Sequence, residues 1–190
     1  MTLPLRSDAR LRRAEIFRAA DQVFARHGIT APLDLVADRA GVGRATLYRN
    51  FPDRAALVTA MLERNLDALE AAAGAQPGDA DPLSNLLHHT MLQLVESPAL
   101  ADAWRIVDPR TEAIRGLRWR LDVIFAGPVA HARAAGRLRQ DFQADDVPTA
   151  LGILGVLIRE PDHDRRLALG ERLLGLLDQG LRPRGAGMAR

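Results

Sequence analysis

Residues 44–54 carry a cluster of side chains that hydrogen-bond to nucleotides. A guanidinium can fork onto the O6 and N7 atoms of guanine or onto a phosphate, hydroxyls bond phosphate oxygens, and an asparagine amide can read adenine. The segment supplies all three groups and contains one acid, Asp53. The candidate contact residues are Arg44, Thr46, Tyr48, Arg49, Asn50 and Arg54. Their types and spacing indicate a surface for double-stranded DNA.

The apolar residues around this segment predict a helix–turn–helix that holds those side chains outward. Gly41 can adopt the left-handed conformation that ends a helix, and Leu47 would face the core from a second helix, predicted over 45–51. An earlier helix that stops at Gly28 must complete this core. Its inner residues are predicted to be Ile16, Phe17, Ala20, Val23 and Phe24, and those of the next two helices Leu33, Val36, Ala37, Ala40, Val42 and Leu47. Such a second helix fits the major groove.

The stretch VADRAGVGRATLYRNFPDRAALVTAML resembles the DNA-binding signature of the TetR family of transcriptional regulators. The resemblance covers about residues 10–62. The matching positions are Val36, Ala37, Ala40, Gly41, Val42, Thr46, Leu47, Tyr48, Phe51 and Arg54. The chain departs from the family pattern at Gly43, where a serine that caps the helix is frequent, and at Pro32, where a serine or threonine usually begins the preceding helix. The rest of the chain resembles the family in length and helical layout.

The resemblance implies a division of labour among the contact residues. Phosphate contacts would fall on Thr46, Tyr48, Arg49 and Arg54, and base contacts on Arg44, Ala45 and Asn50. The alternative for the arginines is an ordinary solvated helix surface. Arg10, Arg12 and Arg13 would coat the first helix, with a minor-groove arm as the other reading.

Helical spacing continues through the chain and predicts an all-α fold of about nine helices. We expect a helix–turn–helix DNA-binding domain at 1–54, a helical regulatory and dimerisation domain at 55–182, and a disordered tail at 183–190. Asp81, Ser97 and Asp108 each precede a proline and are predicted to cap helices. Later helices are expected over 109–135, bent at Gly127–Pro128, over 145–159 and over 163–180.

Composition sets further limits on the function. The chain has 190 residues, of which 47% are hydrophobic and 26% charged, with no cysteine and no lysine. Its net charge is +2, but residues 1–54 carry +4 and the remainder −2, so the basic excess lies with the candidate DNA surface. No apolar run reaches the roughly 18 residues of a membrane span, and no secretory signal is recognised. We therefore expect a cytoplasmic protein with no membrane partner.

The sequence contains few residues that could support catalysis or bind a metal ion. The three serines lie near predicted helix starts, and there is no Gly-x-Ser-x-Gly or phosphate loop. His88 and His89 point about 100° apart on a helix, which disfavours a shared metal ion. The sequence predicts a protein that is not an enzyme and has no metal or cofactor.

The second part of the chain is expected to bind an effector and a second copy of the chain. The residues predicted to line a ligand pocket are His88, Met91, Trp104, Ile106, Trp119 and Phe125, although plain core packing explains them equally well. Arg105, Arg118 or Arg120 could receive an anionic ligand. The predicted dimer interface, placed on the last two helices by the resemblance, comprises Leu151, Leu154, Ile158, Leu169, Leu173, Leu176 and Leu177.

Together these features predict a homodimeric repressor that a small molecule releases from a pseudo-palindromic operator. Repression is what the resemblance implies and is not visible in the residues. Two alternatives stay open. The same fold could act without a small molecule, through a protein partner or constitutively. The other is a helical enzyme or binding module whose DNA-binding segment is not used.

Overall fold

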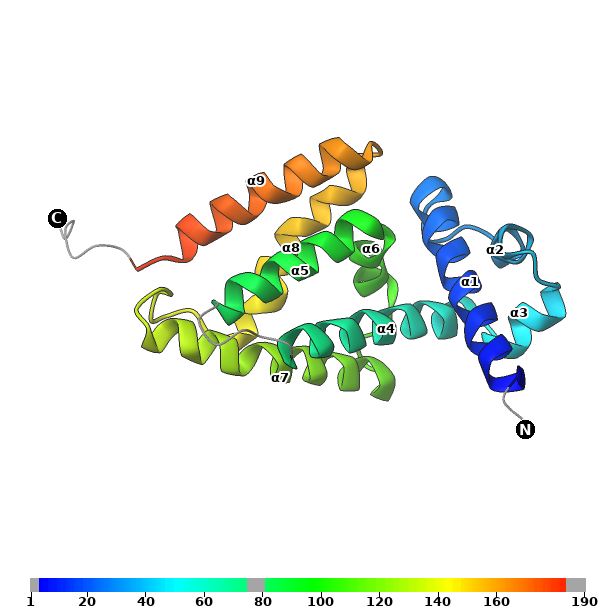
Figure 1. Ribbon diagram of the computed structural model, residues 1–190, viewed down its shortest axis with the longest axis horizontal. Helices are drawn as coiled ribbons and strands as arrows, with labels where there is room; N and C mark the ends of the chain where they lie inside the picture. The colour runs from blue at the N-terminus through cyan, green and yellow to red at the C-terminus, as the bar shows by residue number, and fades with distance from the viewer. Residues whose placement is uncertain (1–3, 75–80, 184–190) are drawn as a thin grey trace.

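The structure is a computed structural model that describes residues 4–74 and 81–183 (Figure 1). These residues form α-helices, two short 3-10 segments and no strand, which confirms the all-α prediction. The expected disordered tail lies outside the described residues from position 184 onward. The helices are α1 (Pro4–His27), α2 (Leu33–Ala40), α3 (Arg44–Asn50), α4 (Arg54–Gly74), α5 (Pro82–Glu96), α6 (Ala99–Ile106), α7 (Glu112–Ala134), α8 (Val147–Leu154) and α9 (His163–Leu181), with 3-10 segments at Ala144–Asp146 and Gly155–Arg159.

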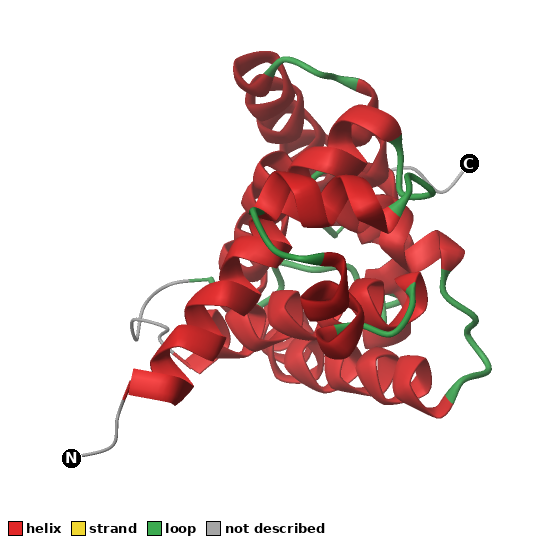
Figure 2. Cartoon of the chain, turned by 90° about the vertical axis from the view of Figure 1, so that its right-hand side faces the viewer, coloured by secondary structure: helices red, strands yellow, loops and turns green. Residues whose placement is uncertain are grey.

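Helices α1, α2 and α3 gather at one end of the molecule, which Figure 2 views end-on. We call this group the head. Gly28 and Gly41 have φ angles of +79° and +65°, a region that glycine enters without a Cβ clash, and each ends the helix before it. The predicted inner residues of the three helices are buried, apart from Ala40 and Val42, which are partly buried against the same core. The helix–turn–helix prediction is therefore confirmed.

Helix α4 begins in the head and runs into the remaining helices, which we call the body (Figure 1). In the body, α5 packs against α4, α7 and α9, while α6 lies between α4 and the segment after α8. Long leucine-rich faces supply the core, among them Leu62, Leu66 and Leu86, which are wholly buried. Pro128 lies inside α7, whose helical assignment continues to Ala134. The helix expected over 145–159 is shorter, because the chain tightens into a 3-10 segment at Gly155.

The predicted helix caps are confirmed at one of three positions. The Asp81 carboxylate accepts hydrogen bonds from the backbone N–H groups of Leu83 and Ser84 at the start of α5. Ser97 makes no cap, because its hydroxyl bonds elsewhere in the molecule. The helix expected from Asp108 starts later, at Glu112, and is capped by the Thr111 hydroxyl.

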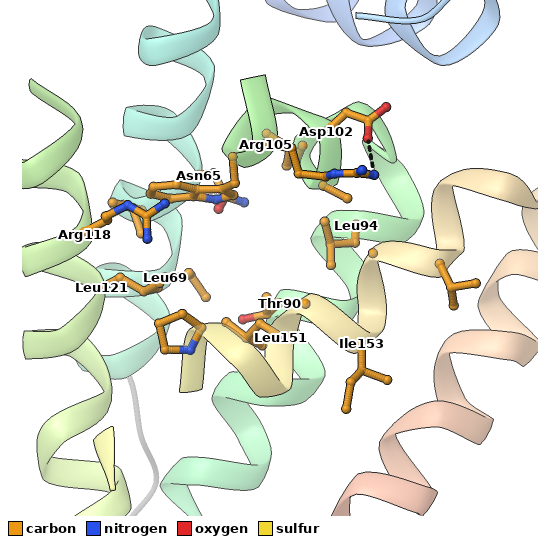
Figure 3. A pocket seen from close by; sticks show the side chains of 18 of the residues that line it. Asn65, Leu69, Thr90, Leu94, Asp102, Arg105, Arg118, Leu121, Leu151 and Ile153 are labelled. Atoms are coloured by element: carbon orange, nitrogen blue, oxygen red, sulfur yellow. Dashed lines mark ion pairs between the residues drawn. The ribbon is translucent and has the colours of Figure 1, made fainter. Parts of the chain in front are cut away.

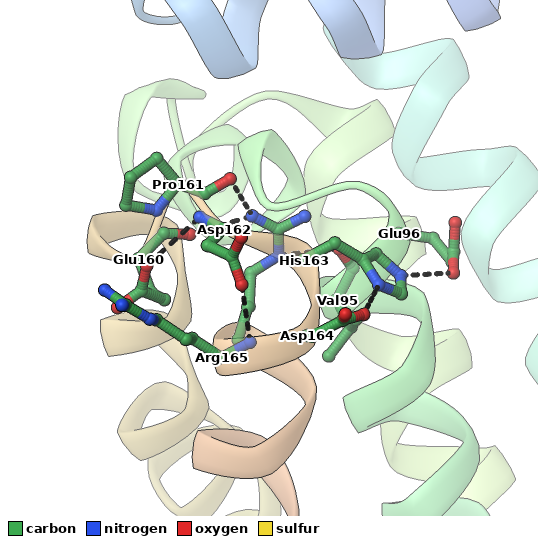
Figure 4. Close-up of polar contacts among 9 residues, drawn as sticks. Val95, Glu96, Glu160, Pro161, Asp162, His163, Asp164 and Arg165 are labelled. Carbon is green, nitrogen blue, oxygen red and sulfur yellow. Dashed lines mark hydrogen bonds and ion pairs between the residues drawn. The ribbon is translucent and has the colours of Figure 1, made fainter.

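A buried arginine fixes α9 onto the end of α5. Arg166 donates from Nε to the backbone carbonyl of Val95 at 2.7 Å and from Nη1 to that of Glu160 at 2.8 Å. Figure 4 shows these backbone groups converging at the junction, where His163 also contacts Glu96. Carbonyls at a helix C-terminus carry partial negative charge, so they compensate a buried guanidinium. One turn later Gly170 packs against Met91.

Candidate nucleic-acid interface and effector cavity

Helix α3 presents its polar side chains outward because a single leucine anchors it. Leu47 is wholly buried, whereas its neighbours in the helix are exposed or partly exposed. Gly43 is the N-cap in extended conformation and makes no side-chain cap bond, as its missing hydroxyl predicts. Tyr48 has 43% of its surface exposed, which is large for an aromatic side chain. A short helix thus carries an open polar face.

An acid on α2 holds two residues of this face. The Arg44 guanidinium pairs with the Asp34 carboxylate at 3.0 Å, and the Tyr48 hydroxyl donates to the same carboxylate at 3.5 Å. Asp34 was not among the predicted site residues. The signal that could have identified it is an acid in the first turn of α2, the helix that directly precedes the one carrying Arg44.

Three other candidate contact residues have defined local partners or positions. The Asn50 amide donates to the carbonyl of Thr46 at 2.8 Å and so closes the end of α3. Arg49 and Ala45 lie exposed on the face. Their roles in contacting DNA, and that of Thr46, stay predictions.

Arg54 has a structural task that the sequence did not indicate. Its Nη1 atom donates to the carbonyls of Ile29 and Ala31, both at 2.6 Å. These bonds tie the start of α4 to the loop between α1 and α2. The phosphate contact predicted for Arg54 is untested by this geometry, and the other guanidinium nitrogens are not used in these two bonds.

The arginines of α1 and α2 behave as helix surface. Arg13 lies over the rings of Phe17 and Phe51, at 5.5 and 5.1 Å from their centroids, and the two rings are themselves 5.5 Å apart. Arg39 donates to the Gln22 amide oxygen at 2.6 Å. The side chain of Arg10 lies outside the described ones.

Polar contacts join the head to the body at one carboxylate. Asp21 on α1 accepts a short hydrogen bond from the Ser97 hydroxyl, which precedes α6, and pairs with Arg64 of α4 at 3.0 Å. The Arg64 guanidinium also lies 4.8 Å from the centroid of the Phe17 ring. Asp21 therefore links α1 to α4 and to the turn that precedes α6.

The body contains a cavity of about 560 Å³ between α4, α5, α6, α7 and α8 (Figure 3). This volume is in the range of small-molecule sites. Each of these helices contributes leucine to the wall: Leu66, Leu69, Leu94, Leu100, Leu121 and Leu151. Asn65, Thr90, Asp102, Trp104 and three arginines add polar groups. Helices α4 and α6 line the cavity and also contact α1, so these two helices connect the cavity to the head.

Comparisons with known proteins agree with the geometry of the head and the body. Residues 16–61 match the family model for bacterial regulatory proteins of the tetR family. Over nearly full length, the chain is 31% identical to the TetR transcriptional regulator SCO0520 from Streptomyces coelicolor, covering 91% of this chain and 99% of that one with a TM-score of 0.63. The chain belongs to the TetR family. It is accordingly a DNA-binding transcriptional regulator and not an enzyme, as predicted.

Two further relatives place the chain within the TetR family. The TetR transcription regulatory protein from Mycobacterium vanbaalenii is 28% identical, covers 94% of this chain and 99% of its own, and gives a TM-score of 0.62. The HTH-type transcriptional activator FasR from Mycolicibacterium smegmatis is 41% identical over 59 residues, which is 30% of this chain and 27% of that protein. The match to FasR is thus confined to a small part of either protein.

The cavity of this TetR protein differs from the predicted pocket. Of the six predicted residues, Trp104 lines it. Met91 and Phe125 are wholly buried core residues, and Ile106 and Trp119 are exposed outside it, Trp119 with 65% of its surface in solvent. His88 lines a separate, smaller pocket, where it contacts Glu171 at 3.0 Å. Met91 and Phe125 thus follow the core-packing alternative, and ligand contact by the predicted residues stays a prediction. Arg105 and Arg118 line the cavity, whereas Arg120 pairs with Asp67 and Glu70.

The predicted dimer residues divide between two faces. Leu154 is wholly buried in its own chain, and Leu151 is partly buried and lines the cavity. The exposed apolar residues of the α8 region are instead Ile153 and Val156, at 48% and 39% exposure. On α9 the four predicted leucines are partly or largely exposed: Leu169, Leu173, Leu176 and Leu177. The side chain of Ile158 is outside those described.

Within 4–74 and 81–183, no group of three or more histidine, cysteine or acidic side chains is arranged to hold a metal ion. In the same residues, no helix has the length and apolar character needed to cross a bilayer.

Proposed function

We propose that this TetR-family regulator is a homodimeric repressor that leaves a pseudo-palindromic operator when a small molecule fills the body cavity. In this proposal residues 1–54 bind DNA, and residues 55–182 bind the effector and the second protomer. The observation that carries it is the open polar face of α3 above a sealed core. That face is rigid because buried Leu47 and Phe51 hold the helix.

The DNA contacts fall on the outer face of α3. Arg44 and Ala45 would meet base edges and Asn50 would assist them, while Thr46, Tyr48, Arg49 and Arg54 would meet phosphates. The Arg44 side chain supports a reading role because most of it is exposed even while it pairs with Asp34, which DNA would have to displace. Phosphates would supply most of the affinity and make it fall with salt.

The dimer would form on the apolar residues that the single chain leaves uncovered on α8 and α9. Leu169, Leu173 and Leu176 lie along one side of α9, and Ile153 and Val156 are exposed near α8. An exposed apolar surface of this kind marks an interaction site. A two-fold axis through it would set two α3 helices about 34–36 Å apart, or a multiple of that spacing.

Effector binding would reach the head through α4 and α6. Both helices line the cavity; Arg64 of α4 pairs with Asp21, and Ser97, in the turn before α6, donates to it. A ligand that fits better when α6 is displaced would strain this contact and change the spacing of the two heads. It can do so only by its difference in affinity for the two arrangements.

Activation is the second candidate for the sign of regulation, because the relative FasR is described as a transcriptional activator. A reporter fused to the promoter that the protein occupies separates the two. Deletion of the gene raises reporter output for a repressor and lowers it for an activator.

The DNA-binding proposal is tested by selecting bound sequences from a random duplex library with the full chain. We expect an enriched palindrome with half-sites one or more helical turns apart. If no sequence is enriched, the proposed operator is contradicted. The same holds if only a single half-site is enriched and light scattering shows the protein to be a monomer. Failure of the chain to bind DNA even at low salt would favour a binding module whose head does not contact DNA.

A further inference from the structure

The body cavity combines an apolar wall with an excess of positive charge. Three guanidinium groups line it, on Arg105, Arg118 and Arg159, against one carboxylate, on Asp102. Asp102 already pairs with Arg105 at 3.6 Å, as the dashed line in Figure 3 marks. Two positive charges thus have no carboxylate partner among the residues that the structure describes. A cationic ligand would meet net repulsion here.

Arg118 is oriented for an anion by an aromatic ring. Its guanidinium carbon lies 5.8 Å from the centroid of the Trp104 ring, and Figure 3 shows it reaching from α7 toward the hollow. A guanidinium that lies over an aromatic face keeps N–H groups free to donate to another partner. Two of those donors match the two oxygens of a carboxylate.

The polar groups deeper in the wall offer little to a ligand. The Thr90 hydroxyl donates to the carbonyl of Leu86 at 2.8 Å, and the Asn65 amide nitrogen donates to Gln93 at 2.6 Å. The Thr90 hydroxyl hydrogen and one of the two Asn65 amide hydrogens are therefore used within the protein. The remaining lining between α4, α5 and α8 is mostly leucine. A ligand would place apolar atoms there and its acceptor atoms at the guanidinium groups.

From these features we infer that the effector of this regulator is an amphipathic carboxylate, an inference that rests on the proposed effector function of the cavity. The carboxylate is held by Arg118, with Arg159 adding attraction at the rim. The aliphatic body lies among Leu66, Leu69 and Leu121. Burial of apolar surface provides most of the affinity, and the guanidinium provides the choice between acids and their neutral analogues.

Binding to the full-length dimer, without DNA, tests this chemistry by isothermal titration calorimetry. The probes are dodecanoate and dodecyltrimethylammonium, each below the concentration at which it forms micelles, and dodecanol below its solubility limit. We expect dodecanoate to bind roughly 10-fold more tightly than dodecanol, as one charge-assisted contact at a partly exposed site allows. The cation is expected to bind more weakly than either. Equal affinity for acid and alcohol, or tightest binding of the cation, would overturn the inference.

Variants assign the preference to a residue. Arg118→Gln should reduce the affinity for dodecanoate to that for dodecanol and leave dodecanol unchanged, while Arg118→Lys should keep part of the preference. Arg115→Gln, on the same helix but outside the lining, is the matched control. Unchanged selectivity in Arg118→Gln would refute the role of this guanidinium. Because Trp119 is exposed and outside the cavity, a Trp119→Phe background lets Trp104 fluorescence report occupancy independently.

The ligand class and the proposed function fail in different assays. Carboxylate-selective binding that leaves operator affinity unchanged would support this ligand chemistry and contradict effector-driven release. Release of DNA by dodecanol as readily as by dodecanoate would retain the effector function and contradict the carboxylate preference.

Discussion

The DNA-facing surface and the effector cavity place their functional groups in opposite ways. On α3 the polar side chains stand on the convex outside of a core that leaves no room inside, with Leu47 wholly buried beneath them. In the body the walls are apolar and the functional groups lie around a hollow built from several helices. A convex surface needs one well-anchored helix, whereas a cavity needs the relative placement of all its walls. The first is therefore robust to change in the body, while the second depends on it.

The largest effect should come from removing the anchor of the convex surface. Leu47→Ala should lower the free energy of unfolding by about 2–5 kcal/mol, since it empties a fully buried site. Chemical denaturation measures this, and operator binding should be lost with it. Leu35→Ala, at an exposed position of the neighbouring helix, is the control and should change stability by at most about 0.5 kcal/mol. Ligand binding to the cavity should survive both changes; its loss in Leu47→Ala would show that the two regions are not separable.

The second effect concerns reading of bases. Arg44→Ala should weaken binding to the selected operator by about 1–3 kcal/mol and relax the preference at one base pair. Asp34→Ala should act in the other direction and strengthen binding to any duplex, because it removes a carboxylate that competes for Arg44. Mobility-shift titrations on operator and scrambled DNA compare the two. An unchanged base preference in Arg44→Ala would remove this residue from the base contacts.

The contact between head and body should have an intermediate effect. Ser97→Ala removes the hydroxyl that bonds Asp21 and should cost about 1 kcal/mol of stability. It should also narrow the difference in operator affinity between the ligand-free and ligand-bound protein. Ser84→Ala, an exposed serine of α5, is the control. If Ser97→Ala responds to ligand as the unmodified chain does, coupling runs through other contacts.

A smaller gain is expected at the start of α3. Gly43 occupies the N-cap position with no side-chain bond. Gly43→Ser would supply the missing acceptor and should stabilise the head by a few tenths of a kcal/mol. Thermal unfolding measures the change, and base preference should stay the same. A loss of stability would mean that the loop cannot admit the side chain.

The smallest effect is a pH dependence at the junction of α5 and α9. The pKa of His163 is raised above its ordinary value of 6.5, chiefly by its hydrogen bond to Glu96 and then by that to Asp164, against the nearby positive charge of Arg166. Its contribution to stability is therefore fully present below pH 6.5 and is lost as the pH rises through the raised pKa. The melting temperature should fall slightly over that interval, and His163→Gln should abolish this component. An identical pH profile in the variant would rule His163 out.

The head could be predicted almost residue by residue from the sequence, and the body only by class. Spacing of Leu33, Val36 and Leu47 determines which side of each head helix is buried, because the helices are short and amphipathic. In the body, the core and the cavity draw on the same apolar face of a helix, as on α7. Periodicity then cannot separate Phe125, which is core, from Leu121, which lines the cavity. Contacts of high sequence separation, such as Asp21 with Ser97, were not visible at all.

The Asp34–Arg44 pair has a kinetic consequence for how this regulator would search a chromosome. A guanidinium that already pairs with a neighbouring carboxylate gains less from an arbitrary phosphate, so residence on unrelated sequence is shortened. Arg44 leaves the Asp34 carboxylate only at a DNA site whose hydrogen-bond acceptors bind the guanidinium more strongly. Asp34 would then act as an internal threshold that speeds sampling and reserves long dwell times for the cognate site.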